Sequence, residues 1–386
     1  MKILKISADG LMLFNDKVSI DFFAEQRVIK DNSDMLSNIF KNVYTNNVIS
    51  VVGINASGKT SVLKLISFAL ELINGQSLNY IVNRDVFTDS KKVNIEVIFY
   101  DDNNNLYKLQ SEIISVRNNE IDNRFIFGAE KIWKKSISKI HSKKDIVSYE
   151  NTNLFKERDN TAEFLSDDVS IAIAISKNNK IFVRDLLNYT NMNMNMLRLI
   201  ENYPHELIKF LDPSIESIIF DKNSSEIKLK FYGKDAISLS NPLQCEKYLS
   251  SGTVKGLNVF LNAMMVFNKG GYLLVDELEN HLNREIVVTL YRFFTNPIVN
   301  KMGATIIFST HYSELLDEFE RSDNIYIVRN KNGISAEKLC NLLKRNDIKK
   351  SDAFKSGYLE GTAPLYESYI DLKEVIINSR TELGVH

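Results

Sequence analysis

Residues 47–60 read NVISVVGINASGKT, and this stretch decides the fold. The apolar run over 47–52 predicts a buried strand, and apolar residues at helical spacing over 61–73 predict a helix. Between them, residues 53–60 match the pattern G-x-x-x-x-G-K-[ST], in which backbone N–H groups wrap phosphates. The stretch therefore predicts a strand, a phosphate-binding loop and a helix, in that order.

The pattern assigns chemistry to this loop. Lys59 reaches the outer phosphates of a nucleotide, and the hydroxyl of Thr60 binds Mg²⁺. A glycine turn ending in a solvated lysine is the structural alternative, and the position of the match between a strand and a helix argues against it. The predicted nucleotide-binding residues are Gly53, Asn55, Ala56, Ser57, Gly58, Lys59, Thr60 and Ser61, and Thr60 is also a predicted metal ligand.

A second apolar run, YLLVDE at 272–277, ends in two adjacent acids. Successive side chains at a strand end point to opposite faces, so one acid can meet Mg²⁺ while the next faces the attacking water. This is the form of a Walker B strand, with Asp276 as metal ligand and Glu277 as catalytic carboxylate. Taken alone, the segment is more typical of a core strand that ends in solvated acids.

Two further segments carry polar residues at the ends of predicted elements. The run ATIIFSTH at 304–311 is an apolar strand that ends in His311, which could be a surface residue or a catalytic sensor that donates a hydrogen bond to the γ-phosphate. Residues 249–253, LSSGT, precede a predicted helix over 254–267, so Ser250, Ser251 and Gly252 would lie at a helix N-terminus suited to an anion. By itself this segment is only a good N-cap.

Composition narrows the class of protein. The 48 Lys and Arg residues nearly balance 49 Asp and Glu residues, so no global basic field indicates nucleic acid. Cys245 and Cys340 form no CxxC pair, which disfavours a zinc site or a disulfide framework. The N-terminus lacks the unbroken apolar region of a signal peptide, and no run approaches membrane-spanning length. We expect a cytoplasmic protein without a membrane partner.

The order of predicted elements indicates an α/β fold in three parts. Residues 1–115 contain an N-terminal strand pair and the phosphate loop, and residues 239–386 alternate strands and helices, which implies parallel strands. Between them, residues 116–238 are rich in Asn, Lys, Ser and Asp, and we expect a mainly helical insertion domain. The head itself should contain a mixed or parallel sheet.

The four segments, in this order, resemble the Walker A loop, signature, Walker B strand and switch histidine of ABC ATPases. The resemblance implies a P-loop NTPase head that binds ATP and Mg²⁺ and hydrolyses ATP in a head-to-head homo-oligomer. It implies that Ser250, Ser251 and Gly252 act on ATP held by the opposite subunit, and that residues 279–282, ENHL, form the D-loop across the interface. The chain departs from the family where Ser251 replaces a usual Gly and Thr253 a frequent Gln or Glu. A Q-loop has no clear match, although Gln110 lies in a plausible strand.

Within that family, the short N-terminal strand pair and the Asn-rich insertion resemble stand-alone bacterial ATPases of the RecF, SMC and overcoming-lysogenization-defect (OLD) group. This resemblance implies an ATPase switch that controls an effector, a nuclease or toxin, in phage defence. One alternative is a RecF-like DNA repair clamp that grips DNA through the basic stretch of Lys134, Lys135, Lys139, Lys143 and Lys144. The other is the ATPase subunit of a transporter, which the missing Q-loop argues against.

Overall fold

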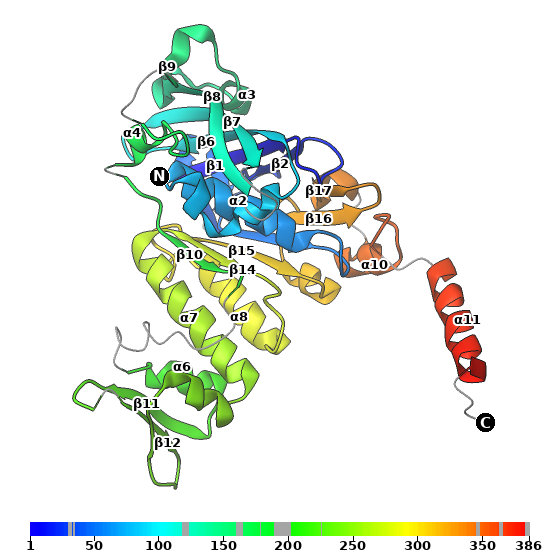
Figure 1. Cartoon of the computed structure of the whole chain (residues 1–386). Coiled ribbons are helices and arrows are strands. Elements are labelled where there is room, and N and C mark those ends of the chain that lie inside the picture. Colours follow the sequence, from blue (N-terminus) through cyan, green and yellow to red (C-terminus); the bar gives the residue numbers. More distant parts are fainter. Residues whose placement is uncertain are drawn as a thin grey trace.

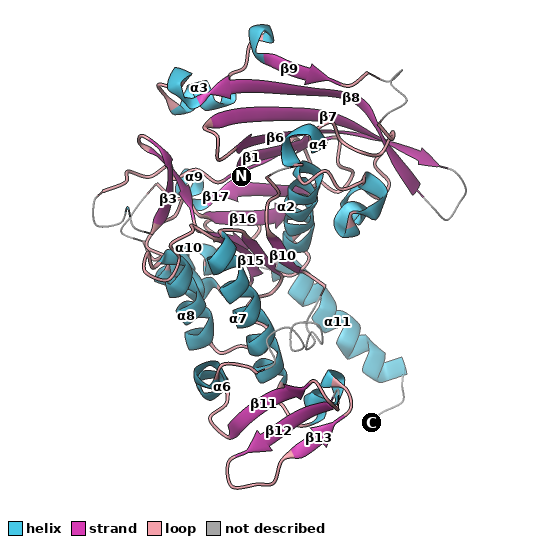
Figure 2. Cartoon of the chain, turned by 90° about the vertical axis from the view of Figure 1, so that its left-hand side faces the viewer, coloured by secondary structure: helices cyan, strands magenta, loops and turns pink. Residues whose placement is uncertain are grey.

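A computed structural model of the chain describes residues 1–29, 33, 35–117, 123–159, 165–177, 179–188, 202–224, 226–344, 348–362 and 366–382. Figure 1 shows two large sheets with a helix between them, and Figure 2 gives the same molecule from the side. Parts of the expected insertion over 116–238 lie outside the described residues.

The first sheet is antiparallel and has the strand order β2-β1-β6-β7-β8-β9. It contains the expected N-terminal strand pair and a hairpin that turns after residue 100. One face of these strands packs into the main core, and Ile98 and Leu106 on the other face join a smaller core. The strands are β1 (Lys2–Asp9), β2 (Val18–Asp21), β6 (Lys92–Tyr100), β7 (Asn105–Arg117), β8 (Asn123–Ser136) and β9 (Leu154–Glu157).

The second sheet is mixed and has the strand order β10-β14-β15-β5-β16-β17. The first five strands are parallel, and only β17 runs antiparallel to its neighbour. The expected mixed α/β sheet is therefore confirmed. Its strands are β5 (Val48–Val52), β10 (Val183–Leu186), β14 (Tyr272–Val275), β15 (Thr305–Thr310), β16 (Ile325–Asn330) and β17 (Ile334–Lys338).

Helices cover both faces of the mixed sheet. The helix α2 (Lys59–Ile73) lies between the two sheets, while α7 (Ser251–Lys269) and α8 (Arg284–Thr295) pack on the far face. The strand β5 illustrates why: Ile49 and Val51 enter the core around α2, and Val48 and Val52 enter the core of the opposite face. Every residue of β5 is buried, as expected for a central parallel strand.

The segment 116–238 differs from the mainly helical insertion that the sequence predicts. Its first strand, β8, extends the antiparallel sheet, and its strand β10 pairs with β14 in the nucleotide-binding sheet. A three-stranded sheet of β11 (Ile215–Asp221), β12 (Glu226–Phe231) and β13 (Ile237–Leu239) follows. Its apolar residues alternate within short runs, and this period favours strands over helices. The described helices of the segment are short: α3 (Lys143–Val147), α4 (Ile173–Ser176) and α6 (His205–Leu211).

The remaining elements lie around these layers. The hairpin of β3 (Leu36–Phe40) and β4 (Val43–Asn46) precedes β5, and the C-terminal part contains α9 (Leu339–Leu342), α10 (Lys350–Lys355) and α11 (Tyr366–Glu382). Figure 1 shows α11 projecting away from the head. Short 3-10 helices η1 to η6 lie at Leu78–Tyr80, Val82–Phe87, Ile137–Lys139, Asn151–Asn153, Pro242–Lys247 and Ser313–Glu318. No helix within the described ranges has both the length and the apolar character needed to cross a bilayer.

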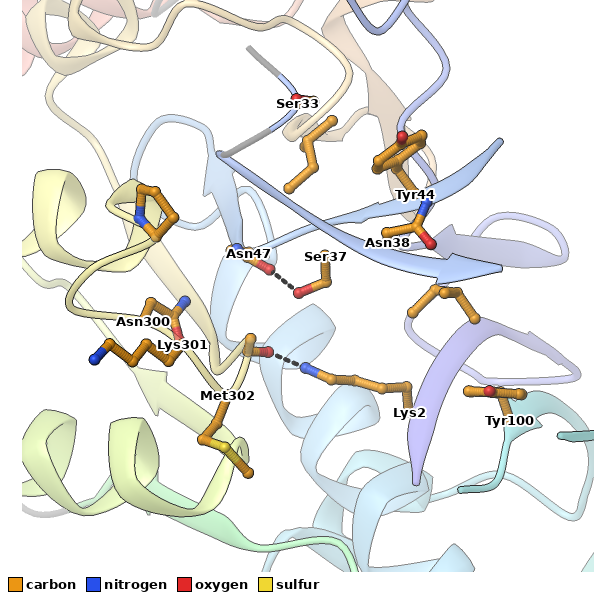
Figure 3. A pocket seen from close by; sticks show the side chains of 14 residues that line it. Lys2, Ser33, Ser37, Asn38, Tyr44, Asn47, Tyr100, Asn300, Lys301 and Met302 are labelled. Carbon is orange, nitrogen blue, oxygen red and sulfur yellow. Dashed lines mark hydrogen bonds between the residues drawn. The ribbon is translucent and has the colours of Figure 1, made fainter. Parts of the chain in front are cut away.

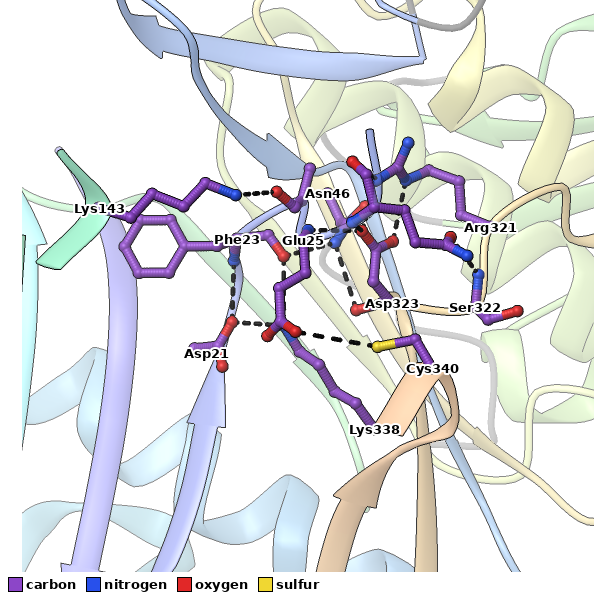
Figure 4. Close-up of polar contacts among 12 residues, drawn as sticks. Asp21, Phe23, Glu25, Asn46, Lys143, Arg321, Ser322, Asp323, Lys338 and Cys340 are labelled. Atoms are coloured by element: carbon purple, nitrogen blue, oxygen red, sulfur yellow. Dashed lines mark hydrogen bonds and ion pairs between the residues drawn. The ribbon is translucent and has the colours of Figure 1, made fainter. Parts of the chain in front are cut away.

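A buried polar network joins the N-terminal part of the chain to the strands after β15 (Figure 4). At its centre, Asp323 pairs with Arg321, with side chains that are 0% and 5% exposed, respectively. Asp323 also accepts the backbone N–H groups of Glu25 and Gln26, at 2.6 and 2.7 Å. The ammonium of Lys338 lies beside Asp21 and Glu25 in the same network. These contacts hold the antiparallel sheet against the mixed sheet.

Removing the centre of this network should destabilise the protein strongly. The Asp323→Ala variant leaves the Arg321 guanidinium buried without its carboxylate, so we expect a loss of about 3–5 kcal/mol in the free energy of unfolding. Urea denaturation followed by circular dichroism measures this loss. The exposed pair of Lys331 and Glu360 supplies the control, because Glu360→Ala should leave the unfolding midpoint unchanged. Equal midpoints for both variants would contradict the role of Asp323.

Candidate functional site

The motif residues meet at the carboxyl ends of the parallel strands, which is where open α/β sheets bind ligands. A cleft of about 440 Å³ opens there. It has a phosphate-loop side, an acidic residue and an apolar wall. The lining residues are Leu13, Asn55, Ala56, Gly58, Lys59, Thr60, Ser61, Glu277, Asn330 and Ile334. The predicted loop and one predicted acid therefore share a single cleft.

The N-terminus of α2 has the features of an anion-binding site. Gly58, its N-cap residue, has φ of 99°, a left-handed conformation that glycine adopts readily, and no side chain caps the helix. The first backbone N–H groups of a helix have no intrahelical acceptor. They are thus available to phosphate oxygens, as the sequence predicts for this loop.

Lys59 arches back over the same loop. Its ammonium donates to the carbonyl oxygens of Gly53 and Ile54, both at 3.0 Å, and the residue is 6% exposed. Burial lowers the pKa of the Lys59 amine, and the nearby carboxylates of Glu277, Glu279 and Asp276 oppose this lowering. A bound polyphosphate would add further negative charge beside this cation.

The two predicted metal ligands lie together. The Thr60 hydroxyl donates to Asp276 Oδ2 at 2.7 Å, and the Ser309 hydroxyl donates to the other oxygen, Oδ1. A hydroxyl and a carboxylate are hard oxygen donors, and Mg²⁺ in nucleotide sites is held by one or two such groups together with phosphates and water. The residues therefore fit Mg²⁺ bound with a nucleotide. No cluster of three or more His, Cys, Asp or Glu residues suited to a metal occurs among the described residues.

Glu277 occupies an unusual backbone position. Its φ is 44°, in the left-handed region that few residues other than glycine adopt. Its backbone N–H donates to Ser309 Oγ at 2.7 Å, so one serine hydroxyl contacts both acids of the Walker B segment. The Asn280 amide lies 3.4 Å from Glu277 Oε2. The backbone leaves the strand at this residue, and the Glu277 side chain lines the cleft.

The signature segment lies at the N-terminus of α7, as predicted. Ser250 is the N-cap residue and accepts the Thr253 N–H at 3.0 Å. Ser251 Oγ lies 3.1 Å from Nδ1 of His281, in the segment that resembles a D-loop. A Cβ atom at Gly252 would lie 2.4 Å from the His281 carbonyl oxygen, so this position requires glycine. The signature therefore packs against the D-loop and does not line the cleft of its own head.

His311 follows β15, the strand between the Walker A and Walker B strands. Its Nδ1 lies 2.8 Å from Glu279 Oε1, and its backbone N–H donates to the same oxygen at 2.7 Å. Its side chain is 39% exposed, whereas that of Glu279 is 1% exposed. The structure thus brings the predicted switch histidine to the edge from which the two acids extend.

Sequence reasoning missed several residues of the site. Lys255, one turn into α7, donates to the Glu277 carbonyl oxygen and is 5% exposed. Burial lowers the pKa of its amine, and the carboxylates of Glu279, Glu277 and Asp276 oppose this. A lysine at a position where α7 is otherwise buried is a signal that could have identified it. Leu13, Asn330 and Ile334 of the cleft have no comparable signal, because they come from a loop and strands distant in sequence.

Gln110 does not lie at this site. It belongs to β7 of the antiparallel sheet, where its side chain is exposed. One of the two strands beside the Walker B strand is β10, in which Leu186 pairs with Val275. Asn188 therefore follows β10 at the same sheet edge as Asp276 and Glu277.

The basic stretch of the insertion does not form one free cationic face. Lys135 is buried and donates to the carbonyl oxygens of Asp145 and Ser148, and Lys134 lies over the rings of Tyr107 and Phe155. Lys143 donates to the carbonyl of Ala24. Lys139, Lys143 and Lys144 are exposed. Three of the five lysines therefore have structural contacts.

A second cleft, of about 520 Å³, lies between β1, the β3–β4 hairpin and the loop before β15 (Figure 3). Lys2 extends along it and donates to the carbonyl oxygen of Gly303. Burial lowers the pKa of the Lys2 amine to about 8, although Asp102 opposes this. Lys2 thus ties the first strand to the loop that leads into β15, away from the motif residues.

A comparison with protein families covers the segments that form this arrangement. A family model described as "AAA domain, putative AbiEii toxin, Type IV TA system" matches residues 48–317, well over half of the chain. Among solved structures, the SMC head domain from Thermotoga maritima is similar, with 13% sequence identity and a TM-score of 0.42, over 88% of this chain and 99% of that chain. The comparison with curated proteins gives no match. The family model spans the predicted Walker A loop, signature, Walker B acids and His311, and the chain belongs to this AAA-domain family.

Proposed function

We propose that the protein binds ATP with Mg²⁺ and hydrolyses it in sites that two heads complete together. Lys59 and the N-terminus of α2 hold the phosphates, Thr60 and Asp276 hold the metal, and Glu277 orients the attacking water. The bound Mg²⁺ supplies charge neutralisation on the phosphates. Leu13 and Ile334 form an apolar wall of the cleft that suits a nucleobase.

One observation supports a composite site above the others. Ser250, Ser251 and Gly252 stand at a helix N-terminus suited to an anion, yet they do not line the cleft of their own head. A second copy in head-to-head contact would bring its signature to the open side of this cleft. ATP binding would then favour the paired state, and hydrolysis would release it.

We further propose that this ATP cycle is a switch in the cytoplasm that controls an effector during phage infection. The family description connects this kind of AAA domain with a toxin–antitoxin system, which supports a role in such a system. A DNA clamp has less support, because three lysines of the basic stretch have structural contacts.

The mass of the wild-type protein in solution, with and without ATP and Mg²⁺, tests the switch. Light scattering coupled to size exclusion should show a mass increase with ATP and a return toward the smaller species as phosphate is released. Lys59→Ala, which removes the phosphate-binding amine, is the matched control and should stay at the smaller mass. A wild-type mass that is the same with and without ATP would contradict the proposed switch.

A further inference from the structure

Glu279 has two contacts with the switch histidine that no motif assigns. Its Oε1 accepts the His311 backbone N–H at 2.7 Å and lies 2.8 Å from His311 Nδ1. Glu279 comes from the loop after Walker B, whereas His311 comes from the end of β15. A single carboxylate oxygen therefore fixes the backbone and the ring of His311 at once.

The shared oxygen determines where the ring proton lies. Because a backbone N–H can only donate, Glu279 Oε1 acts as an acceptor in this arrangement. The Nδ1 atom of His311 must then be the protonated one, and in the neutral ring Nε2 carries a lone pair. A neutral His311 accepts a hydrogen bond through Nε2, and only a doubly protonated ring can donate one to a phosphate oxygen. The sequence prediction of a histidine that simply donates is refined accordingly.

The second oxygen of Glu279 gives independent support. Glu279 is 2% exposed, and its Oε2 is buried without a hydrogen-bond partner among the described residues. Buried polar groups without partners are rare and usually reflect function. The carboxylate also acts electrostatically on the amines of Lys59 and Lys255, opposing the effect of burial on both. Glu279 is thus a buried third acid close to Asp276 and Glu277, behind the lining of the cleft.

We propose that Glu279 is a positioning residue that holds His311 in its Nδ1-protonated tautomer and leaves Nε2 free for the γ-phosphate end of the cleft. When the ring takes a second proton, Glu279 balances its positive charge, so that the imidazolium can donate to a phosphate oxygen. This inference rests on the proposed ATP hydrolysis. It adds a positioning residue, and the carboxylate of this residue links the loop after the Walker B strand to the switch histidine.

Nitrogen NMR of histidine rings tests the tautomer without any nucleotide chemistry. The chain has five histidines, so selective ¹⁵N-histidine labelling gives few signals, and His311→Ala identifies the one of interest. At mildly alkaline pH, the wild type should show Nδ1–H for His311. Glu279→Leu, which removes the acceptor, should lose this preference, while Glu279→Gln, whose amide oxygen still accepts, should keep it. A wild-type His311 protonated at Nε2 would overturn the proposal.

Kinetics then test the consequence for turnover. Glu279→Leu should lower kcat about 10–100-fold, the usual range for groups that orient a functional residue, while KM for ATP changes little. Glu279→Gln should restore part of the loss, and Glu285→Leu, at an exposed acid of α8, is the matched control. An unchanged kcat in Glu279→Leu that retains ATP binding would refute the inference. A wild type without ATPase activity would instead refute the proposed function, and the NMR result would still stand.

Discussion

Phosphate release by Glu277→Gln should fall about 10²–10⁴-fold below the wild type, which is the range that a positioned proton acceptor contributes. Glutamine has the same shape and keeps the contact with Asn280, but its amide cannot take a proton from water. Glu277 is the one acid among the described residues that line the cleft, so no second carboxylate of that lining can replace it. ATP binding should persist, because Lys59, Thr60 and Asp276 are unchanged.

Two measurements on the same samples separate these effects. Phosphate release reports turnover, and binding of a fluorescent ATP analogue reports the occupied cleft. The paired heads should persist with ATP in this variant, since hydrolysis no longer releases them. Glu285→Gln, an exposed acid of α8, should behave as the wild type. Full activity in Glu277→Gln would show that another group activates the water.

The second large effect concerns the signature. Gly252→Ala should abolish most ATPase activity, because the added Cβ would meet the His281 carbonyl oxygen at 2.4 Å and displace the D-loop. ATP binding by the altered head should remain, since Gly252 does not line its own cleft. Ser251→Ala, which removes only the contact with His281 Nδ1, should have a smaller effect.

Mixing two inactive variants turns this into a test of the composite site. Lys59→Ala retains an intact signature, and Gly252→Ala retains an intact phosphate loop. In a symmetric pair, a mixed dimer contains one complete site, so an equimolar mixture should recover about a quarter of wild-type activity. Recovery can occur only if the signature acts in trans. A mixture as inactive as its components, although mixed dimers form, would exclude the composite arrangement.

Parts of the site that involve only residues close together in the sequence can be predicted from it. The strand, loop and helix around Lys59 need only neighbouring residues, and Ser250 caps α7 through a residue three positions away. These are contacts that turn chemistry and helical period specify. For the same reason, the expected strands and helices of the head are confirmed at nearly all positions.

Contacts between segments do not follow from the sequence in this way. Ser309 meets Asp276, and Glu279 meets His311, because β15 lies beside β14 in the sheet. The order of strands in a sheet cannot be derived from a single sequence. The sequence therefore predicts His311 as a site residue but not its contact with Glu279. The prediction of a mainly helical segment over 116–238 was wrong for a related reason. Its strand β10 depends on pairing with the distant strand β14, which the segment alone does not specify, whereas the alternating runs of β11 to β13 do carry a local strand signal.

The position of β10 has a practical consequence for protein engineering. Because Val183–Leu186 forms the edge of the nucleotide-binding sheet beside the Walker B strand, a chimera that exchanges residues 116–238 as a cassette would remove a strand from the host head. The graft points consistent with this topology lie after Leu186 and before α7, so that β8 to β10 stay with the head. What can be transplanted is the small three-stranded lobe, and the recipient would keep its own catalytic edge intact.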